Sequence, residues 1–174
     1  MSQNHKILFI FIDLELTDDL LVAQAFSFLS AGVETVTNTV SFTLHELARN
    51  QQLQDQVRGE IFASLERHGG LSYQGVAELK LLEMCLKETM RKYPATKHLL
   101  RVCTAEYDLD ENLRLETGDC LVIPLSGIHN DPANFDNPEE YRPERFREAP
   151  AAGTYIPFGD GPRICLGINN FEQF

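Results

Sequence analysis

The chain has 174 residues, 43% of them hydrophobic, and a formal net charge of −11 at pH 7. This size fits one domain with one sizeable core, and the acidic balance argues against a nucleic-acid binder, which needs clustered Lys and Arg to neutralise phosphates. The four cysteines form no Cys-x-x-Cys pair, so the sequence predicts neither a zinc site nor a dense disulfide framework; they are Cys85, Cys103, Cys120 and Cys165.

The chain begins with a short apolar run and then a long predicted helix. Residues 7–12 are apolar but too few to span a bilayer, so we expect no membrane anchor within this chain. Thr17 can cap a helix, and Asp18 and Asp19 follow it at the positive end of the helix dipole. Residues 20–49 contain no proline, and apolar side chains recur on most sides. A long, central and buried helix is therefore predicted here.

Two further helices are predicted within residues 50–93. Residues 50–67 form a more polar pattern that ends at the pair Gly69-Gly70, and glycine is the usual residue just after a helix. Residues 79–93 form the other helix, which Pro94 ends because proline cannot continue a helix.

The second half of the chain has short apolar runs and many prolines in place of long helical patterns. Residues 94–130 contain three short predicted strands, the last two joined through residues 117–119; the strands are 99–103, 112–115 and 120–123. Residues 131–167 contain six prolines and many Asn and Asp residues, which is typical of an ordered meander without regular structure. The predicted fold class is mainly α with a small β portion.

One run near the C-terminus, FGDGPRICLG at residues 158–167, places Cys165 in a glycine-rich loop. Glycines let backbone N–H groups approach a sulfur closely, and the nearby cation of Arg163 favours the thiolate, which is the form that binds metals. A lone cysteine in such a loop is more often an idle thiol. Gly159 and Gly161 could also form a phosphate-binding turn, but no Lys-Ser or Lys-Thr pair follows them.

Two other groups of residues have a position or spacing that suggests a functional or structural role. Gly32 lies in the middle of the long predicted helix, where glycine costs about 1 kcal/mol relative to alanine. Thr35 follows it and could simply bond back to the carbonyl of Ala31, as helical threonines often do. Glu88 and Arg91 lie three residues apart on one helical face, where an exposed ion pair is the default interpretation.

These motifs together resemble the cytochrome P450 family. The pattern Phe-x-x-Gly-x-Arg-x-Cys-x-Gly is complete at residues 158–167, and Ala-Gly-x-Glu-Thr, Glu-x-x-Arg and Pro-Glu-Arg-Phe precede it in the order of the family. The resemblance extends over about residues 17–167 and is strongest to animal microsomal members, particularly those of insects. It implies that the chain is a partial domain, the C-terminal haem-bearing part of the fold. Residues 1–16 and 168–174 match nothing in the family.

The resemblance implies a haem cofactor whose iron takes the thiolate of Cys165 as its axial ligand. Guanidinium groups suit carboxylates, and by resemblance Arg163 and Arg101 would bind the haem propionates. The other cofactor-binding positions that match the family are Phe158, Gly161, Gly167, Ala31 and Gly32.

By the same resemblance, the long helix would pass close to the distal face of the haem and open locally for dioxygen. Thr35 would hydrogen-bond the iron-bound oxygen, and Glu34 would help to relay protons through water. Glu88, Arg91 and Arg145 would form a buried charged triad with a structural role, which locks the meander against the helix.

The implied activity is a monooxygenase that inserts one atom of dioxygen into an apolar organic substrate, lipid-like or xenobiotic. Its electrons would come from an NADPH-dependent reductase at the cytoplasmic face of the endoplasmic reticulum membrane. Two alternatives stay open: a truncated, non-enzymatic product without a stable haem site, and a haem-thiolate isomerase or dehydratase, against which the Glu34-Thr35 pair argues. The remaining cysteines are expected to be core thiols; they are Cys85, Cys103 and Cys120.

Overall fold

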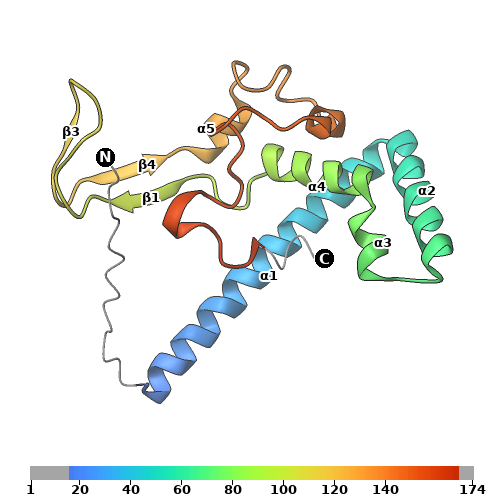
Figure 1. Ribbon diagram of the computed structural model, residues 1–174, viewed down its shortest axis with the longest axis horizontal. Helices are drawn as coiled ribbons and strands as arrows, with labels where there is room; N and C mark the ends of the chain where they lie inside the picture. Colours follow the sequence, from blue (N-terminus) through green and yellow to red (C-terminus); the bar gives the residue numbers. More distant parts are fainter. Residues whose placement is uncertain (1–15, 169–174) are drawn as a thin grey trace, which may run out of the picture. The chain divides into compact units, whose positions relative to one another are not determined.

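The computed structural model describes residues 16–168, so residues 1–15 and 169–174 lie outside the described residues. Helices predominate and two small two-stranded sheets follow them, which confirms the predicted class (Figure 1). The elements are α1 (Asp18–Arg49), α2 (Gln51–His68), α3 (Tyr73–Ala77), α4 (Lys80–Lys92), β1 (Leu99–Val102), β2 (Tyr107–Asp108), β3 (Arg114–Leu115), β4 (Cys120–Ile123), α5 (Leu125–Asn130), and the 3-10 helices η1 (Pro143–Arg147) and η2 (Gly161–Arg163).

The chain divides into two compact units, residues 1–33 and residues 34–174, and each is described by itself. The first contains the N-terminal part of α1, which begins as predicted: the hydroxyl oxygen of Thr17 accepts the N–H of Leu20 at 3.2 Å. The expectation of a buried helix is wrong for this part of α1, because most of its apolar side chains are exposed; Phe26, for example, is 69% exposed.

The second unit contains the C-terminal part of α1, and here too most of the helix is exposed. Its four buried side chains are Thr39, Thr43, Glu46 and Leu47. The hydroxyl of Thr43 lies 2.8 Å from the hydroxyl of Thr89 on α4. The burial of a helix depends on the elements that pack against it, and this stretch of α1 packs against α4.

By length and composition alone, α1 could also cross a membrane. Core helices of soluble proteins and signal sequences have the same composition, so this is a weak sign of a span. The run at residues 7–12, which the sequence singled out as too short to span a bilayer, lies outside the described residues.

Helices α2 to α4 form the compact part of the second unit. The side chain of Asn50 accepts the N–H of Leu53 at 3.0 Å at the start of α2, and Gly69 ends the helix with a φ of 70°, which favours glycine. The carboxylate of Glu60 accepts the N–H groups of Leu81 and Leu82 and so caps α4. The buried core lies between α1, α2 and α4; its members are Leu47, Leu53, Val57 and Cys85.

The strands pair differently from their order in the chain. The two strands that residues 117–119 join, β3 and β4, do not pair with each other. Instead β4 is antiparallel to β1, with Ile123 opposite Leu99, and β3 is antiparallel to β2. β2 and the short helices α3 and α5 were not predicted, because each has too few residues for a periodic pattern.

Candidate functional site

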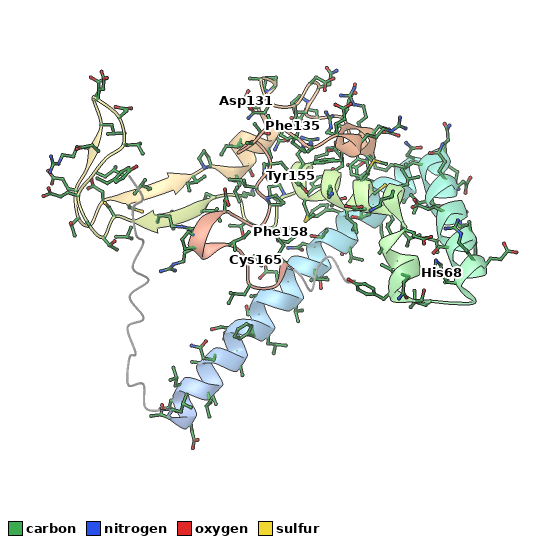
Figure 2. All side chains as sticks on the ribbon, in the orientation of Figure 1. His68, Asp131, Phe135, Tyr155, Phe158 and Cys165 are labelled. Carbon is green, nitrogen blue, oxygen red and sulfur yellow. The ribbon has the colours of Figure 1, made fainter. Side chains whose placement is uncertain are left out.

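Residues 158–167, here called the Cys loop, fold back on themselves (Figure 2). The backbone N–H of Cys165 donates to the carbonyl of Phe158 at 2.9 Å and closes the loop. Gly159 and Gly161 have φ angles of 75° and 73°, which only glycine adopts without strain. The side chain of Asp160 accepts the N–H of Gly161 at 2.7 Å. Local hydrogen bonds therefore hold the cysteine in place.

The thiol of Cys165 is free and its residue is exposed. A side-chain carbon built on Gly167 would lie 3.8 Å from this sulfur, so the glycine leaves that side of the thiol bare. The adjacent side chains of Ile164 and Leu166 are apolar and exposed, Leu166 to 85%. An exposed thiol between apolar side chains fits a flat apolar group bound through a metal.

Two arginines lie on the elements that meet at the Cys loop. A side-chain carbon built on Gly159 would lie 3.6 Å from Leu99 on β1, so the loop packs against this strand. Arg101 lies two residues further and therefore on the same face of β1; its side chain donates to the carbonyl of Leu100. Arg163 is exposed. Within residues 16–168 neither guanidinium forms an ion pair, so both are available to carboxylates of a ligand.

The proposed distal residues fall in both units. Ala31 and Gly32 belong to the first unit, and a side-chain carbon built on Gly32 would meet nothing within 4 Å. Glu34 and Thr35 belong to the second unit and are exposed. The hydroxyl of Thr39 donates to the carbonyl of Thr35 at 3.0 Å. Their placement next to a haem stays a prediction.

The structure brings Glu88, Arg91 and Arg145 together. Arg91 donates to both carboxylate oxygens of Glu88, from Nε at 2.8 Å and from Nη2 at 2.9 Å, and both side chains are fully buried. Arg145 donates to the same carboxylate from Nε at 3.0 Å. Glu88 and Arg91 therefore do not form an exposed surface ion pair. The bond from Arg145 to Glu88 joins η1 to α4.

Sequence reasoning missed a second carboxylate in this network. Asp136 is shared by Arg142 and Arg145, whose guanidinium groups lie 2.6 Å and 3.2 Å from its two oxygens. The hydrogen bond from Arg142 lowers the pKa of Asp136. Asp136 is nine residues from Arg145 in a stretch without regular structure, so no helical or strand spacing could indicate the contact.

His129 and Tyr155 were missed as well. The imidazole of His129 is fully buried, and its Nε2 accepts the backbone N–H of Ile156 at 3.1 Å. Burial, and then the charge of Arg91, lower the pKa of His129 to about 4. The phenol of Tyr155 donates to the carbonyl of Lys87 at 3.1 Å. None of the sequence motifs includes this histidine, and in the structure it binds backbone.

The other three cysteines are not all core thiols. Cys85 is buried, and burial raises its pKa to about 12. Cys103 is half-buried, and its thiol lies 2.9 Å from the carbonyl of Ala105. Cys120 is exposed, which makes the expectation wrong for this residue. It begins β4, where alternate side chains face outward from a sheet of two strands.

Metal clusters built from several side chains do not occur in the described part of the chain: there, no group of three or more His, Cys, Asp or Glu residues could hold an ion. A haem iron needs only one axial ligand from a loop such as the Cys loop. The donor set of one exposed thiol, two arginines without an ion pair to the described residues, and apolar neighbours therefore fits a haem better than an isolated metal ion.

Comparison with known proteins agrees with this interpretation of the site. A protein-family model described as cytochrome P450 matches residues 7–169. The chain is 41% identical over 157 residues to the probable cytochrome P450 6d5 of Drosophila melanogaster, covering 87% of this chain and 31% of the relative. It is 43% identical over 159 residues to the probable cytochrome P450 6a20 of the same fly and 40% identical over 159 residues to cytochrome P450 6j1 of Blattella germanica, covering in both cases 88% of this chain and 32% of the relative. The chain thus spans about a third of the length of these relatives.

Proposed function

Because the chain belongs to the cytochrome P450 family, we propose that it is the haem-bearing part of a monooxygenase. The cofactor of the family is haem with a cysteine thiolate ligand. When bound, this group supplies the oxygen chemistry, and the protein supplies binding, orientation and proton delivery. The proposed reaction inserts one atom of dioxygen into an organic substrate.

One observation carries the proposal: the thiol of Cys165 is exposed on a loop that its own backbone N–H closes onto Phe158. This geometry supports a thiolate that would hold the haem iron, since the residue is exposed while the backbone around it is held. We propose that Arg163 and Arg101 bind the two propionates through charge-assisted hydrogen bonds. Phe158, Gly161 and Gly167 would shape the loop around the sulfur.

Proton delivery is proposed for the long helix. The hydroxyl of Thr35 would hold a proton for transfer to the oxygen substrate, and the carboxylate of Glu34 would exchange protons with solvent water. The exposure of Glu34 supports this role. Ala31 and Gly32 would leave room for the substrate, because neither carries a large side chain. This pair of proton donors favours oxygen activation over a haem-thiolate isomerase or dehydratase, and a need for dioxygen and reductant distinguishes the two.

The finer parts of the function follow from the family alone. We propose an apolar organic substrate, lipid-like or xenobiotic, and electrons from an NADPH-dependent reductase. The proposed location is the cytoplasmic face of the endoplasmic reticulum membrane. The buried group of Glu88, Arg91 and Arg145 would be structural and would hold the meander, and with it the Cys loop, against α4.

The test is the absorbance of the purified chain after haem loading, reduction and addition of carbon monoxide. A thiolate-ligated haem gives a red-shifted Soret band, and Cys165→His should replace it with the spectrum of an imidazole-ligated iron and abolish monooxygenation. Replacing each other cysteine with Ser is the matched control and should leave the band unchanged; the control positions are Cys85, Cys103 and Cys120.

A red-shifted band that survives in Cys165→His would contradict the ligand assignment. No haem band in the unmodified chain would instead favour the alternative of a non-enzymatic product without a stable haem site. The exposed apolar side chains of α1 are the observation that favours this alternative, because such surface in a complete enzyme is expected to be covered.

A further inference from the structure

His129, on α5, is bonded at both ends to groups that lie far apart in the chain. Its carbonyl accepts a hydrogen bond from Nη1 of Arg91 at 3.0 Å, and its Nε2 accepts the N–H of Ile156 at 3.1 Å. Arg91 belongs to the buried charged triad, and Ile156 precedes the Cys loop by two residues. One fully buried residue thus joins the triad to the loop.

The protonation state of this imidazole follows from its bonds. Because Nε2 accepts a hydrogen bond, the neutral ring carries its proton on Nδ1. Nδ1 is buried and, within the described residues, makes no hydrogen bond of normal geometry, although the backbone of Met90 is close enough to favour the protonated ring. The ring also lies 5.5 Å from the ring of Tyr155, centroid to centroid. A buried polar atom without a good partner is costly, so an apolar side chain would fill this space with less cost, but it would leave the N–H of Ile156 unpaired.

The bond to Ile156 leads directly to the cysteine. The carbonyl of Ile156 accepts the N–H of Gly159 at 3.0 Å, and the carbonyl of Phe158 accepts the N–H of Cys165 at 2.9 Å. Successive backbone hydrogen bonds therefore connect the imidazole to the residue that carries the thiol. Movement of Ile156 would be passed to the thiol, because these short turns have little freedom of their own.

We propose that His129 is a positioning residue, which couples the buried triad to the Cys loop and so sets where the thiol of Cys165 lies. This inference rests on the proposed role of Cys165 as haem ligand. His129 acts through the backbone of Ile156 and does not itself touch the haem. Its neutral Nε2 accepts the N–H of Ile156 and so holds this backbone in place. Any other hydrogen-bond acceptor at that position should replace it.

Amide hydrogen exchange of the 174-residue chain tests the proposal without haem. His129→Leu keeps the volume and removes the acceptor, and it should speed exchange at Ile156 by at least about tenfold, as expected for the loss of one buried hydrogen bond. Gly159 and Cys165 should exchange faster too. His129→Gln should restore protection, because its amide oxygen can accept the same N–H. His98→Leu, at an exposed histidine, is the matched control and should change nothing.

The outcome is decided at Ile156. Unchanged protection there in His129→Leu would overturn the proposal, as would a lack of protection in the unmodified chain. If His129→Leu also loosens α2, monitored at Val57, the Gln variant decides: protection retained at Ile156 supports the acceptor role, and protection lost overturns it.

A second measurement separates this proposal from the proposed function. In the haem-loaded chain, His129→Leu should lower the share of the red-shifted carbon monoxide band, and His129→Gln should restore it. A merely space-filling residue would give the opposite order, with Leu the better substitute, and that order would overturn the proposal. If the unmodified chain gives no such band, the proposed haem function fails, while the exchange data still decide whether His129 holds the loop.

Discussion

Glu88 has the most demanding environment of any single residue in the triad. Its carboxylate is fully buried and accepts hydrogen bonds from two guanidinium groups and from the backbone N–H of Arg142, at 2.9 Å. Taking these charges out of water is expensive, and their mutual attraction offsets the cost only while every partner is present. Arg91 is further held by the carbonyl of Pro138 at 2.7 Å. The network thus holds as a unit.

Removing the charge of Glu88 should therefore be severe. Glu88→Gln is expected to lower the free energy of unfolding by about 3–5 kcal/mol, because it leaves the cation of Arg91 buried without a counter-charge. Glu83→Gln, the same change on the same helix, is the matched control. Its partner Lys80 is exposed and its partner Lys87 is half-exposed, so its cost should stay below about 1 kcal/mol. Urea unfolding measures both, and equal costs would contradict a buried triad.

His129 should make the stability of the chain depend on acidity. Its folded pKa is about 4, against an ordinary value of 6.5. Above pH 6.5 the ring is neutral in both states; between 6.5 and 4 the unfolded chain binds a proton that the folded chain does not. The free energy of unfolding should therefore fall as the pH is lowered through this window, by at most about 1.4 kcal/mol per pH unit from this group.

The comparison with His129→Gln isolates this effect from the carboxylates that also titrate in acid. Unfolding in urea at several pH values should show a shallower loss of stability for the variant between pH 6.5 and 4. Arg91 on α4, whose positive charge also disfavours the charged ring, stays in place in both proteins. The same slope in both would show that His129 is not held neutral.

At the scale of elements, the Cys loop and α1 each contain a glycine, but the two glycines have different backbone conformations. Gly161 in the loop has a φ of 73°, and Gly32 has no left-handed φ and lies in the interior of α1. At both positions a side-chain carbon would meet nothing within 4 Å. The backbone conformation alone therefore decides what an alanine does at each position.

The two substitutions should have opposite signs. Gly161→Ala should destabilise the chain by about 1–2 kcal/mol, the cost of a left-handed conformation for a residue with a side chain. Gly32→Ala should stabilise α1 by about 0.5–1 kcal/mol, because glycine is a poor helix former. Thermal unfolding followed by circular dichroism compares them. A destabilised Gly32→Ala would contradict the interpretation that this glycine is kept for space and not for folding.

At the scale of the whole molecule, the two units differ in how they are stabilised. Residues 34–174 contain the buried core, the charged network and the Cys loop. In the described part of the first unit, apolar side chains of α1 are exposed; they include Leu21, Val22, Phe26 and Leu29. Contiguous exposed apolar surface marks a region that binds other apolar groups.

The chain by itself should consequently bind a fluorescent apolar dye and tend to aggregate. Replacing Phe26 and Leu29 together with Lys should lower dye fluorescence and aggregation, because it interrupts the apolar surface of α1. Leu71→Lys is the control, since Leu71 is even more exposed than Phe26 and Leu29 but lies in the loop before α3. Dye binding that is unaffected by the paired change would place the apolar surface elsewhere.

The sequence by itself determined what depends on near neighbours. Thr17 and Gly69 mark helix ends because caps act over a few residues, and the spacing of Glu88 and Arg91 sets their contact within one helix turn. The order of motifs around Cys165 indicated the family, which the comparisons bear out. These signals either depend on residues close together in the chain or come from the order of several motifs along it.

Only the tertiary structure decided which surfaces meet. The prediction that α1 is buried was wrong. An apolar pattern indicates which side chains would be stabilised by burial, but it does not indicate whether another element packs against them. The pairing of β1 with β4 skips the two strands between them. His129 finds Ile156 27 residues further along the chain. Contacts at such separations depend on how the intervening chain folds, and no local spacing encodes that path.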